Sequence, residues 1–438
     1  MARIGQAATM GFLLLGLAGC GGTSTLPEST TVGPSPQLPQ PTNSLIPTVH
    51  IAPAQGWPQG AAPTAPAGLR VTAFASGLDH PRWIYTLPNG DVLVAESNKP
   101  KPTEETARKG FRAWVMGKMM KRAGAGMPSA NRITLLRDAD GDGVAEMRVT
   151  FLKDLNSPFG MALVGSEFFV ANADAVMKFP YTPGQTTITV PGVQFADLPA
   201  GINHHWTKNL LPSRDGSKFY VTVGSNSNIG ENGLDAEEGR AAIWEIDAKT
   251  GKGRIFASGL RNPNGLGWEP QTGRLWTVVN ERDELGNDLV PDYLTSVDDG
   301  AFYGWPWSYF GANVDARVKP ARPDLVAKAK VPDFALGAHV APLGLVFSDG
   351  RMMNGRFASG AFIGEHGSWN RKPRSGYKVV FVQFANGRPT GQPQDVLTGF
   401  VSSDGKAYGR PVGVALDAKG ALLVADDVGN VVWRVASP

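Results

Sequence analysis

Histidine, arginine and acidic residues stand at matching points of a phrase that the chain repeats six times. His205 lies in "NHHWTKNL" and Arg261 in "GLRNPNGLGW". An imidazole, with an ordinary pKa of about 6.5, accepts a proton near neutral pH, and a guanidinium stabilises negative charge that develops beside it. A channel mouth is also polar simply because it is wet, so position alone leaves both catalysis and hydration open. The polar residues at these points are Glu96, Asn172, His205, Arg261, Asn262, Glu281, Asp283, His339, His366, Arg410 and Asp426.

The repeated phrase predicts the elements that position these residues. Each copy runs from a Gly, Pro or His cluster through a short apolar run and a turn to a second run such as "LLVAD". Such runs, bounded by Gly, Pro and Asp, are typical of strands. Equivalent residues are separated by 78, 47, 57, 78 and 71 positions, and the shortest spacing fits the roughly 40 to 50 residues of a four-stranded propeller blade. They are His80, Pro158, His205, Asn262, Val340 and Pro411.

The sequence therefore predicts an all-β fold, a six-bladed β-propeller of four-stranded blades. The longer spacings need loop or helix insertions, which we place around residues 97–131 and 315–332. The last copy supplies three strands only, and "LRVTAFASG" from Leu69 is expected to add the fourth. An N-terminal strand in the last blade would close the ring and remove an exposed sheet edge. An open array of β-sandwiches is the alternative.

Composition limits the class of protein. The 438 residues are 42% hydrophobic and 18% charged, which suits a folded globular chain. The formal net charge of +3 is too small to indicate a nucleic-acid partner. The one basic concentration, "RKGFRAWVMGKMMKRAGAG" around Lys109, predicts an amphipathic insertion helix that rests either on the protein or on an anionic surface.

The N-terminus predicts export and lipidation. Arg3 precedes the run "MGFLLLGLAGC", which is too short to span a bilayer. "LAGC" resembles the lipobox of bacterial lipoproteins, with Cys20, the single cysteine, as the lipidated residue; a buried structural cysteine is the alternative. We predict a signal peptide at 1–19, a Pro-, Ser- and Thr-rich tether at 20–66 and the propeller at 67–438. The protein is then expected in the periplasm or at the outer membrane of a bacterial envelope.

Several unlike motifs occur in one order along residues 68–438: "NHHWTKNL", "FYVTVGS", "GLRNPNGLGW", "YGWP" and "YGRPVGVALD". Together they resemble the soluble pyrroloquinoline quinone (PQQ)-dependent aldose and sorbosone dehydrogenases. The resemblance implies a six-bladed propeller that oxidises a sugar, either an aldose or a sorbosone-like aldehyde hydrate. It also implies PQQ as hydride acceptor, a calcium ion and a separate electron acceptor.

The resemblance assigns roles to individual residues. It makes His205 the general base, with His204 in the place of an acidic residue of the glucose-oxidising members. It places Arg261 and Asn262 at the reactive quinone carbonyl and Arg410 at the cofactor carboxylates. From the residues alone, the histidine pair equally suits a metal or a structural contact, and Arg261 an Arg-Asn-Pro turn between blades.

Further cationic and acidic residues have weaker assignments. Lys372 and Arg374 in "NRKPRSG" match cofactor contacts loosely, and a solvated loop is the alternative. The family's calcium loop corresponds to "NERDELGND", which places Asp283 and Glu284 nearest the ion; a solvated acidic turn is the alternative. In "DADGDG", Asp138, Asp140 and Asp142 fit an EF-hand loop, but Val149 replaces the bidentate glutamate. A tight turn, with or without structural calcium, is therefore predicted there.

Two rival functions remain open from the sequence. One is a non-enzymatic surface propeller that binds a partner or a polysaccharide, and the other is a calcium-dependent lactonase. The combination of "HHW", "RNPNG" and "GRPVG" favours the dehydrogenase. No "CxxCH" haem site and no strand-linked "GxGxxG" is present, which argues against haem and nicotinamide. Aromatic walls for a sugar ring are predicted from Trp206, Tyr303, Trp305 and Trp369.

Overall fold

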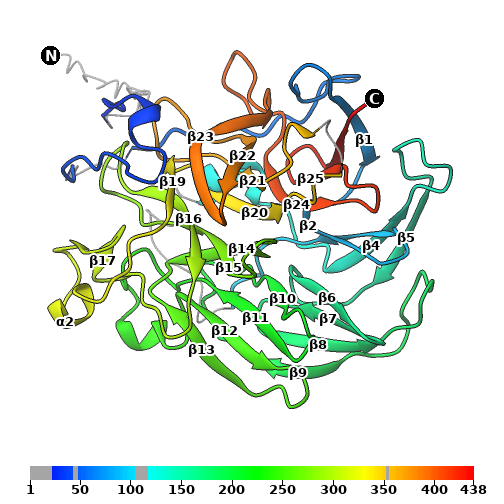
Figure 1. The fold of residues 1–438 in the computed structure, drawn as a ribbon, viewed down its shortest axis with the longest axis horizontal. Coiled ribbons are helices and arrows are strands. Elements are labelled where there is room, and N and C mark those ends of the chain that lie inside the picture. The colour runs from blue at the N-terminus through cyan, green and yellow to red at the C-terminus, as the bar shows by residue number, and fades with distance from the viewer. Residues whose placement is uncertain (1–21, 43–47, 104–116, 352–354) are drawn as a thin grey trace, which may run out of the picture.

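Six four-stranded antiparallel sheets form a ring in the computed structural model, which describes residues 22–42, 48–103, 117–351 and 355–438 (Figure 1). Cys20 and the predicted signal peptide lie outside the described residues. Blade 1 contains β2 (Pro81–Thr86), β3 (Val92–Glu96), β4 (Arg132–Arg137) and β5 (Met147–Leu152). Blade 2 contains β6 (Met161–Val164), β7 (Glu167–Ala171), β8 (Ala175–Pro180) and β9 (Val193–Asp197). Blade 3 contains β10 (Leu210–Pro212), β11 (Lys218–Val223), β12 (Ala242–Asp247) and β13 (Gly253–Ser258).

The second half of the ring follows the same pattern. Blade 4 contains β14 (Asn262–Trp268), β15 (Leu275–Asn280), β16 (Pro291–Val297) and β19 (Phe334–Ala338). Blade 5 contains β20 (Pro342–Phe347), β21 (Gly360–Glu365), β22 (Lys378–Ala385) and β23 (Arg388–Leu397). Blade 6 joins β24 (Pro411–Leu416), β25 (Leu422–Asp426) and β26 (Val431–Ala436) to β1 (Arg70–Ser76). The predicted six-bladed propeller is confirmed.

Ring closure follows the prediction as well. Strand β1 pairs antiparallel with β26, with Arg70 opposite Ala436 and Ser76 opposite Val431. The first strand of the chain thus completes the last blade and covers an edge that would otherwise be open to pairing with another chain. The two ends of the propeller are held by one sheet.

The core is divided among the blade interfaces. Among the described residues, six hydrophobic clusters are found, and each lies mainly at one interface between neighbouring blades. In the cluster between blades 1 and 2, for example, Trp83 packs on Phe159 and Phe151 on Phe168. Because every blade is fixed on both sides, the strand ends at the ring face have defined positions.

The innermost strand of each blade begins, and the next strand ends, on one face of the ring. The antiparallel register shows this directly, with Pro81 opposite Glu96, Asn262 opposite Asn280, and Pro411 opposite Asp426. Residues that precede an innermost strand therefore meet residues that follow the second strand. We call this surface the ring face.

Insertions carry the remaining short elements. These are η2 (Lys121–Ala125), the 3-10 helix η3 (Leu234–Glu237), the hairpin of β17 (Ser308–Tyr309) and β18 (Asn313–Val314), and α2 (Pro323–Val326). The predicted insertions at 97–131 and 315–332 contain η2 and α2, respectively. Part of the predicted basic helix, residues 104–116, lies outside the described residues. No described helix is long and apolar enough to cross a membrane.

The N-terminal segment, predicted as a tether, packs on the propeller over its described residues 22–42 and 48–66, which we call the arm (Figure 1, dark to medium blue). It includes the 3-10 helix η1 (Glu28–Thr30). It forms bridges from Gly33 to Ala335, Ala54 to Ala407 and Thr64 to Thr398. Isolated backbone pairs and a few buried side chains suffice to dock it, although its composition lacks strand or helix periodicity. The boundary at residue 67 stays a prediction.

Apolar residues of the arm enter the clusters between blades. Val32 lies in the cluster of blades 4 and 5, and Ala52 in that of blades 5 and 6. The Trp57 ring lies 5.4 Å from Phe400 and 5.3 Å from Trp433, and its Nε1 donates to Asp426 at 2.6 Å. Burying one such aromatic side chain contributes roughly 1.5–3 kcal/mol. The arm is therefore part of the folded domain surface.

Candidate active site

His205 lies on the ring face, between blades 2 and 3 in the sequence. Its Nδ1 is 2.9 Å from the carbonyl oxygen and 3.0 Å from Oγ of Ser225. Because a carbonyl only accepts hydrogen bonds, Nδ1 carries the hydrogen and Nε2 keeps a lone pair. Burial lowers the pKa of His205 well below its usual range, with help from the charges of His204 and Arg261. The imidazole is therefore neutral and able to accept a proton at pH 7.

Arg261 is linked to His205 through Ser225, and its guanidinium donates its hydrogen bonds to oxygens of the protein. Its backbone oxygen accepts from the Ser225 amide at 2.7 Å, which couples it to the His205 partner. The guanidinium is buried and donates to five oxygens in the loop region of blades 3 and 4. These are the carbonyls of Asn228 (3.3 Å), Asn280 (3.4 Å) and Glu281 (2.6 Å), Asn228 Oδ1 (3.1 Å) and Asp283 Oδ2 (2.9 Å).

Asn262 and Gly224 bring blades 3 and 4 into close contact beside His205. A Cβ atom on Gly224 would lie 2.4 Å from Asn262 Oδ1 and 2.5 Å from His205 Cβ. Only glycine fits at such an approach. Among the described residues, Asn262 Oδ1 has no hydrogen-bond partner. The predicted contact of Asn262 with the quinone stays a prediction, and the structure places its amide next to the proposed base.

Asp283 is the centre of a charged cluster on this side, which we call the Asp283 cluster. Besides Arg261, it meets Asn370 Nδ2 at 2.8 Å and His339 Nδ1 at 3.6 Å. His339 Nε2 donates to the Gly286 carbonyl at 2.9 Å. Burial opposes ionisation of Asp283, but Arg261 and His339 outweigh it and lower its pKa to about 2. Asp283 raises the pKa of His339 against the effect of burial.

Two further carboxyls near this loop, Glu281 and Asp292, have raised rather than lowered pKa values. Asp292 accepts from the amides of Glu281 and Ala341, both at 2.7 Å. Burial raises the pKa of Glu281 to about 8 and that of Asp292 to about 7. Glu281, predicted to lie at the ring face, is thus largely protonated at neutral pH, and its Oε2 accepts from the Arg282 amide at 2.8 Å.

A second charged cluster surrounds Asp427, and we call it the Asp427 cluster. Arg82 donates to Asp427 Oδ2, while His366 Nε2 lies 2.9 Å and His80 Nε2 3.5 Å from the same oxygen. Burial opposes ionisation of Asp427, but His366, His80 and Arg82 hold its pKa far below the usual range. Burial is also the main reason that the pKa of His366 falls to about 4 and that of His80 decreases.

Arg410 belongs to this second cluster. Its charge contributes to lowering the pKa values of His80 and His366, after burial and partly offset by Asp427. Its Nη2 donates to the Ala52 carbonyl of the arm at 3.1 Å, and its guanidinium lies 5.0 Å from the Tyr377 ring centre. Neither Arg410 Nε nor Arg82 Nε has a hydrogen-bond partner in the described part of the chain.

The loop "NRKPRSG" mainly holds the arm. Arg374 donates to the carbonyls of His50 (3.2 Å) and Ile51 (2.9 Å), and Lys372 is exposed. Arg371, which the sequence did not single out, is buried and bonds Ser24 Oγ at 2.9 Å. The predicted cofactor contacts of Lys372 and Arg374 stay predictions, and the structure gives Arg374 another task.

The oxygens assigned to calcium have other partners. Asp283 faces Arg261, whereas Glu284 pairs with Arg317 at 3.7 Å. The carbonyls of Asn280 and Glu281 accept from the Arg261 guanidinium. This arrangement does not fit a calcium ion, because a permanent cation already occupies the loop oxygens. The predicted calcium ion could bind at Asp283 and Glu284 only if these bonds to arginine were released.

The "DADGDG" loop presents a different arrangement. Carboxylate oxygens of Asp138, Asp140, Asp142 and Glu146 lie within 4.8 Å of one another. It is the one group in the described residues in which three or more such ligand atoms all lie within 4.8 Å of one another, and it is mostly exposed. The turn is also closed by its own bonds, such as the Gly141 amide to Asp138 at 2.6 Å. Ion binding there stays a prediction.

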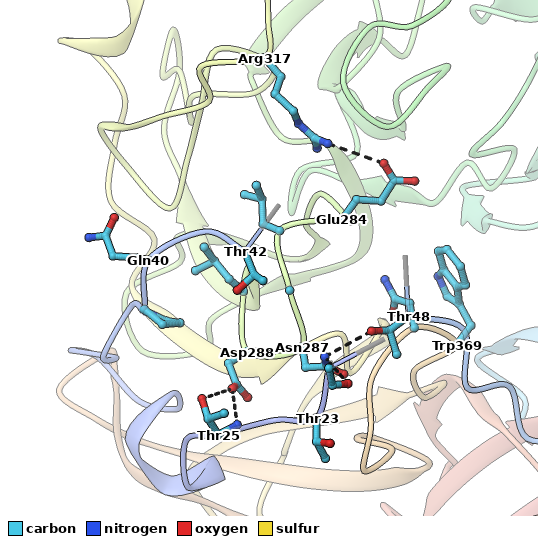
Figure 2. Close-up of a pocket in the computed structure, with 16 residues that line it drawn as sticks. Thr23, Thr25, Gln40, Thr42, Thr48, Glu284, Asn287, Asp288, Arg317 and Trp369 are labelled. Carbon is cyan, nitrogen blue, oxygen red and sulfur yellow. Dashed lines mark hydrogen bonds and ion pairs between the residues drawn. The ribbon is translucent and has the colours of Figure 1, made fainter. Parts of the chain in front are cut away.

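Of the four predicted aromatic walls, three are buried. Trp206 packs under Arg82 at 5.6 Å, and Tyr303 and Trp305 bond the carbonyls of Ser296 and Asn228. Trp369 is half-buried and lines a cavity of about 610 Å³ between the arm and blades 4 and 5 (Figure 2). This cavity adjoins the Asp283 cluster through Asn370.

Sequence reasoning missed several residues of the ring face. Arg82 and Asp427 were absent from the candidate set, although "HPRW" and "ADD" lie in the tags of the first and sixth copies. Asn228 and Asn370 lie in loops outside the repeated phrase. The first and fifth copies, with His80 and His366, thus contribute to the charged site as much as the third and fourth.

Comparisons with known proteins agree with this fold. A family model described as TrAA12-like matches residues 129–293 and 323–437. An uncharacterised protein of Borreliella burgdorferi is 27% identical over 297 residues, covering 65% of this chain and 77% of that protein. The pyrroloquinoline quinone-dependent pyranose dehydrogenase of Coprinopsis cinerea is 25% identical over 431 residues, covering 84% of this chain and 54% of that protein. The chain thus spans about half of that relative's length.

A solved structure supports the same assignment. The holo form of the pyranose dehydrogenase PQQ domain from Coprinopsis cinerea has a TM-score of 0.67 and 22% identity, covering 88% of this chain and 100% of that chain. At this identity, the similarity shows the shared fold. The family match covers more than half of the chain and includes His205, Arg261 and Arg410. The protein therefore belongs to the TrAA12-like family, which confirms the resemblance that its motifs indicated.

Proposed function

We propose that this protein is a PQQ-dependent dehydrogenase that oxidises a sugar, with His205 as general base. The observation that carries the proposal is the fixed tautomer of His205, whose Nδ1 is bound to Ser225 while Nε2 is left as a proton acceptor. The similarity to the Coprinopsis cinerea pyranose dehydrogenase supports the cofactor and the substrate class. An aldose or a sorbosone-like aldehyde hydrate would serve as substrate.

The Asp427 cluster supports cofactor binding. Arg82 and two histidines surround the Asp427 carboxylate, and the charge of Arg410 acts on both histidines; neither arginine Nε has a partner among the described residues. Such an excess of cationic donors fits the carboxylates of PQQ, which guanidinium groups bind by charge-assisted hydrogen bonds. When bound, PQQ supplies a two-electron hydride acceptor.

The chain's own residues would perform the proton transfer. The low pKa of His205 keeps Nε2 unprotonated, so it can take the proton of the substrate hydroxyl while hydride leaves the same carbon. The sugar would lose a hydride, which carries its two electrons, and a hydroxyl proton, which His205 would take; a separate acceptor would later remove the two electrons. Arg261 acts as a positioning residue, because its donors hold the loop and its carbonyl holds Ser225.

The proposal is tested with purified apoprotein. PQQ is titrated while quinone absorbance is followed, and reduction of a redox dye is then measured with aldoses and with an aldehyde hydrate. We expect saturable quinone binding and quinone-dependent dye reduction. Lactone hydrolysis with calcium is assayed in parallel, because it would indicate the rival lactonase. Absence of quinone binding would sink the dehydrogenase proposal.

We also propose that the protein is exported and attached to a bacterial membrane by lipid on Cys20. Arg3, the apolar run and "LAGC" support this location. In a bacterial host, the Cys20→Ser protein is expected to leave the membrane fraction, and mass spectrometry of the wild type should show the lipid. Equal membrane retention of both forms would contradict a lipid anchor.

A further inference from the structure

The cavity beside the Asp283 cluster has a polar lining that comes from two parts of the chain. Thr23, Gln40, Thr42 and Thr48 belong to the arm, whereas the propeller provides Asn287 and Trp369 among others. Figure 2 shows Gln40 and Thr42 across the cavity from Trp369. Its volume of about 610 Å³ lies in the usual range for small-molecule sites.

The arm is fixed to the wall that it faces. The side-chain Nδ2 of Asn287 donates to the Gly22 carbonyl at 2.8 Å and to Thr48 Oγ1 at 3.3 Å. The backbone amide of Thr42 donates to the Leu285 carbonyl at 2.9 Å. The Asp288 carboxylate accepts from the Thr25 amide at 2.7 Å. A wall held in this way needs little ordering when a ligand enters, which favours binding.

The chemistry of the lining suits a saccharide. Hydroxyl and carboxamide groups both donate and accept hydrogen bonds, as sugar hydroxyls require. The half-buried indole of Trp369 offers an apolar face with a polar edge, which suits one face of a pyranose ring. Three charged residues are found in the described lining. Asp288 is bonded to the arm, and Glu284 is paired with Arg317. The lining therefore has no excess of positive charge that would favour an anionic ligand.

The position of the cavity determines which part of a substrate it can hold. Asn370 lines it and bonds Asp283, but neither His205 nor Arg261 is part of the lining. A sugar unit in the cavity would therefore contact Asn370 on the side of the Asp283 cluster and would not itself be the unit that gives its proton to His205. Binding energy from such a remote unit can orient the reacting one.

We propose that the arm and blades 4 and 5 form a binding subsite for the non-reacting units of an oligosaccharide. The proposal rests on the function proposed above, because it extends the substrate from a single sugar to a chain whose end reaches His205. It assigns the arm a role in specificity. The volume, equal to on the order of twenty water molecules, leaves room for more than one sugar ring.

The first test uses apoprotein, so it does not depend on PQQ. Binding of short cello-, malto- and xylo-oligosaccharides is measured by calorimetry. The wild type is expected to bind at least one series. Trp369→Ala and Gln40→Ala should each weaken binding about tenfold, which is the affinity that one stacking contact or hydrogen bond usually contributes. Trp307→Ala and Gln55→Ala are matched controls, because Trp307 is also half-buried, Gln55 is also exposed in the arm, and neither lines the cavity.

The second test uses the quinone-loaded enzyme. In Gln40→Ala, the KM for the bound oligosaccharide is expected to rise about tenfold, whereas kcat and the KM for the matching monosaccharide stay unchanged. If quinone binds and monosaccharides react but no oligosaccharide binds, or the controls lose as much affinity, the subsite proposal is wrong. If quinone fails to bind while apoprotein still binds oligosaccharides, the dehydrogenase proposal fails and the cavity assignment stands.

Discussion

Arg261 and Arg82 lie in two charged clusters on the same face of the ring and differ in what surrounds them. In the Asp283 cluster, the Arg261 guanidinium donates to five protein oxygens and its charge is matched by Asp283. In the Asp427 cluster, Arg82 shares one carboxylate with two histidines and lies near Arg410, and its Nε has no described partner. In the Asp283 cluster, protein oxygens accept from every nitrogen of the Arg261 guanidinium. In the Asp427 cluster, the Nε donors of Arg82 and Arg410 have no described partner.

The difference teaches which cluster holds the scaffold and which can receive an anion. A buried arginine with all donors satisfied fixes a loop, because releasing any partner leaves an unpaired polar group at a cost of roughly 1–3 kcal/mol. A cluster with excess donors gains by binding a carboxylate. We therefore expect changes near His205 to act on turnover, changes at Asp283 on stability, and changes near Asp427 on cofactor affinity.

The largest expected effect is the loss of turnover in His205→Gln. Without the proton acceptor, kcat should fall by about 10²–10⁴, the usual contribution of a general base. PQQ affinity should remain, because His205 is not part of the Asp427 cluster. Stopped-flow dye reduction and a quinone titration measure the two quantities separately.

His204→Gln is the control for this prediction. Its ring centre lies 4.6 Å from that of His205, and its charge helps to lower the pKa of His205. Turnover should persist, while the acidic limb of the kcat/KM profile moves to higher pH. Full turnover in His205→Gln would show that another group removes the proton.

The second prediction concerns stability. Asp283→Ala leaves the buried Arg261 without its partly exposed carboxylate, and the unpaired donor should cost about 1–3 kcal/mol. Urea unfolding of the apoprotein measures this loss. Asp299→Ala breaks the exposed pair with Arg254 and should cost only about 0–1 kcal/mol. Equal losses in the two variants would refute a structural role for the Asp283 cluster.

The third prediction separates two of the three arginines that the sequence assigned to the cofactor, Arg410 and Arg374. Arg410→Gln should weaken PQQ binding about 10–100-fold, because a hydrogen bond to a charged group is worth about 1.5–3 kcal/mol. Arg374→Gln should have a smaller effect, since its donors hold the His50 and Ile51 carbonyls of the arm. It should instead make the arm more sensitive to proteolysis. An equal loss of affinity in Arg374→Gln would mean that Arg374 leaves the arm to bind the cofactor.

The propeller was predictable because local pattern and global fold agree. Each copy of the phrase encodes an innermost strand, a turn and a second strand, and the three-strand last copy required β1. His205, Arg261 and Arg410 were found for the same reason, because they precede innermost strands at the ring face. The hydrogen bonds that satisfy the Arg261 guanidinium were not predictable, because the accepting oxygens come from loops of blades 3 and 4.

The Asp427 cluster and the arm escaped sequence reasoning for physical reasons. Arg82 and Asp427 are 345 positions apart and meet only because ring closure brings blades 1 and 6 together. In the arm, the buried Val32 and Ala52 and the packed Trp57 are separated by proline-rich runs without periodicity. Their partners lie in blades 4 to 6, so composition alone suggested a tether.

The smallest effect is a difference in sign of the pH dependence of stability. The pKa of Glu281, raised from 4.5 to about 8, means that the folded state holds this proton more tightly, so stability falls as pH rises between these values. The pKa of His366, lowered from 6.5 to about 4, means that the unfolded state takes up the proton first, so stability falls as pH drops through that window.

Each group therefore contributes at most about 1.4 kcal/mol per pH unit, with opposite signs. Above pH 6.5 His366 no longer contributes, so Glu281→Gln should flatten its part of the decline of unfolding free energy between pH 6.5 and 8. His366→Gln should reduce the loss between pH 6.5 and 4 and leave the alkaline side unchanged. Urea titrations across this range test both. If Glu281→Gln changed the unfolding free energy only below pH 6.5, the Glu281 carboxyl would be ionised in the folded protein at neutral pH. The Asp283 cluster would then carry more negative charge than its hydrogen bonds indicate.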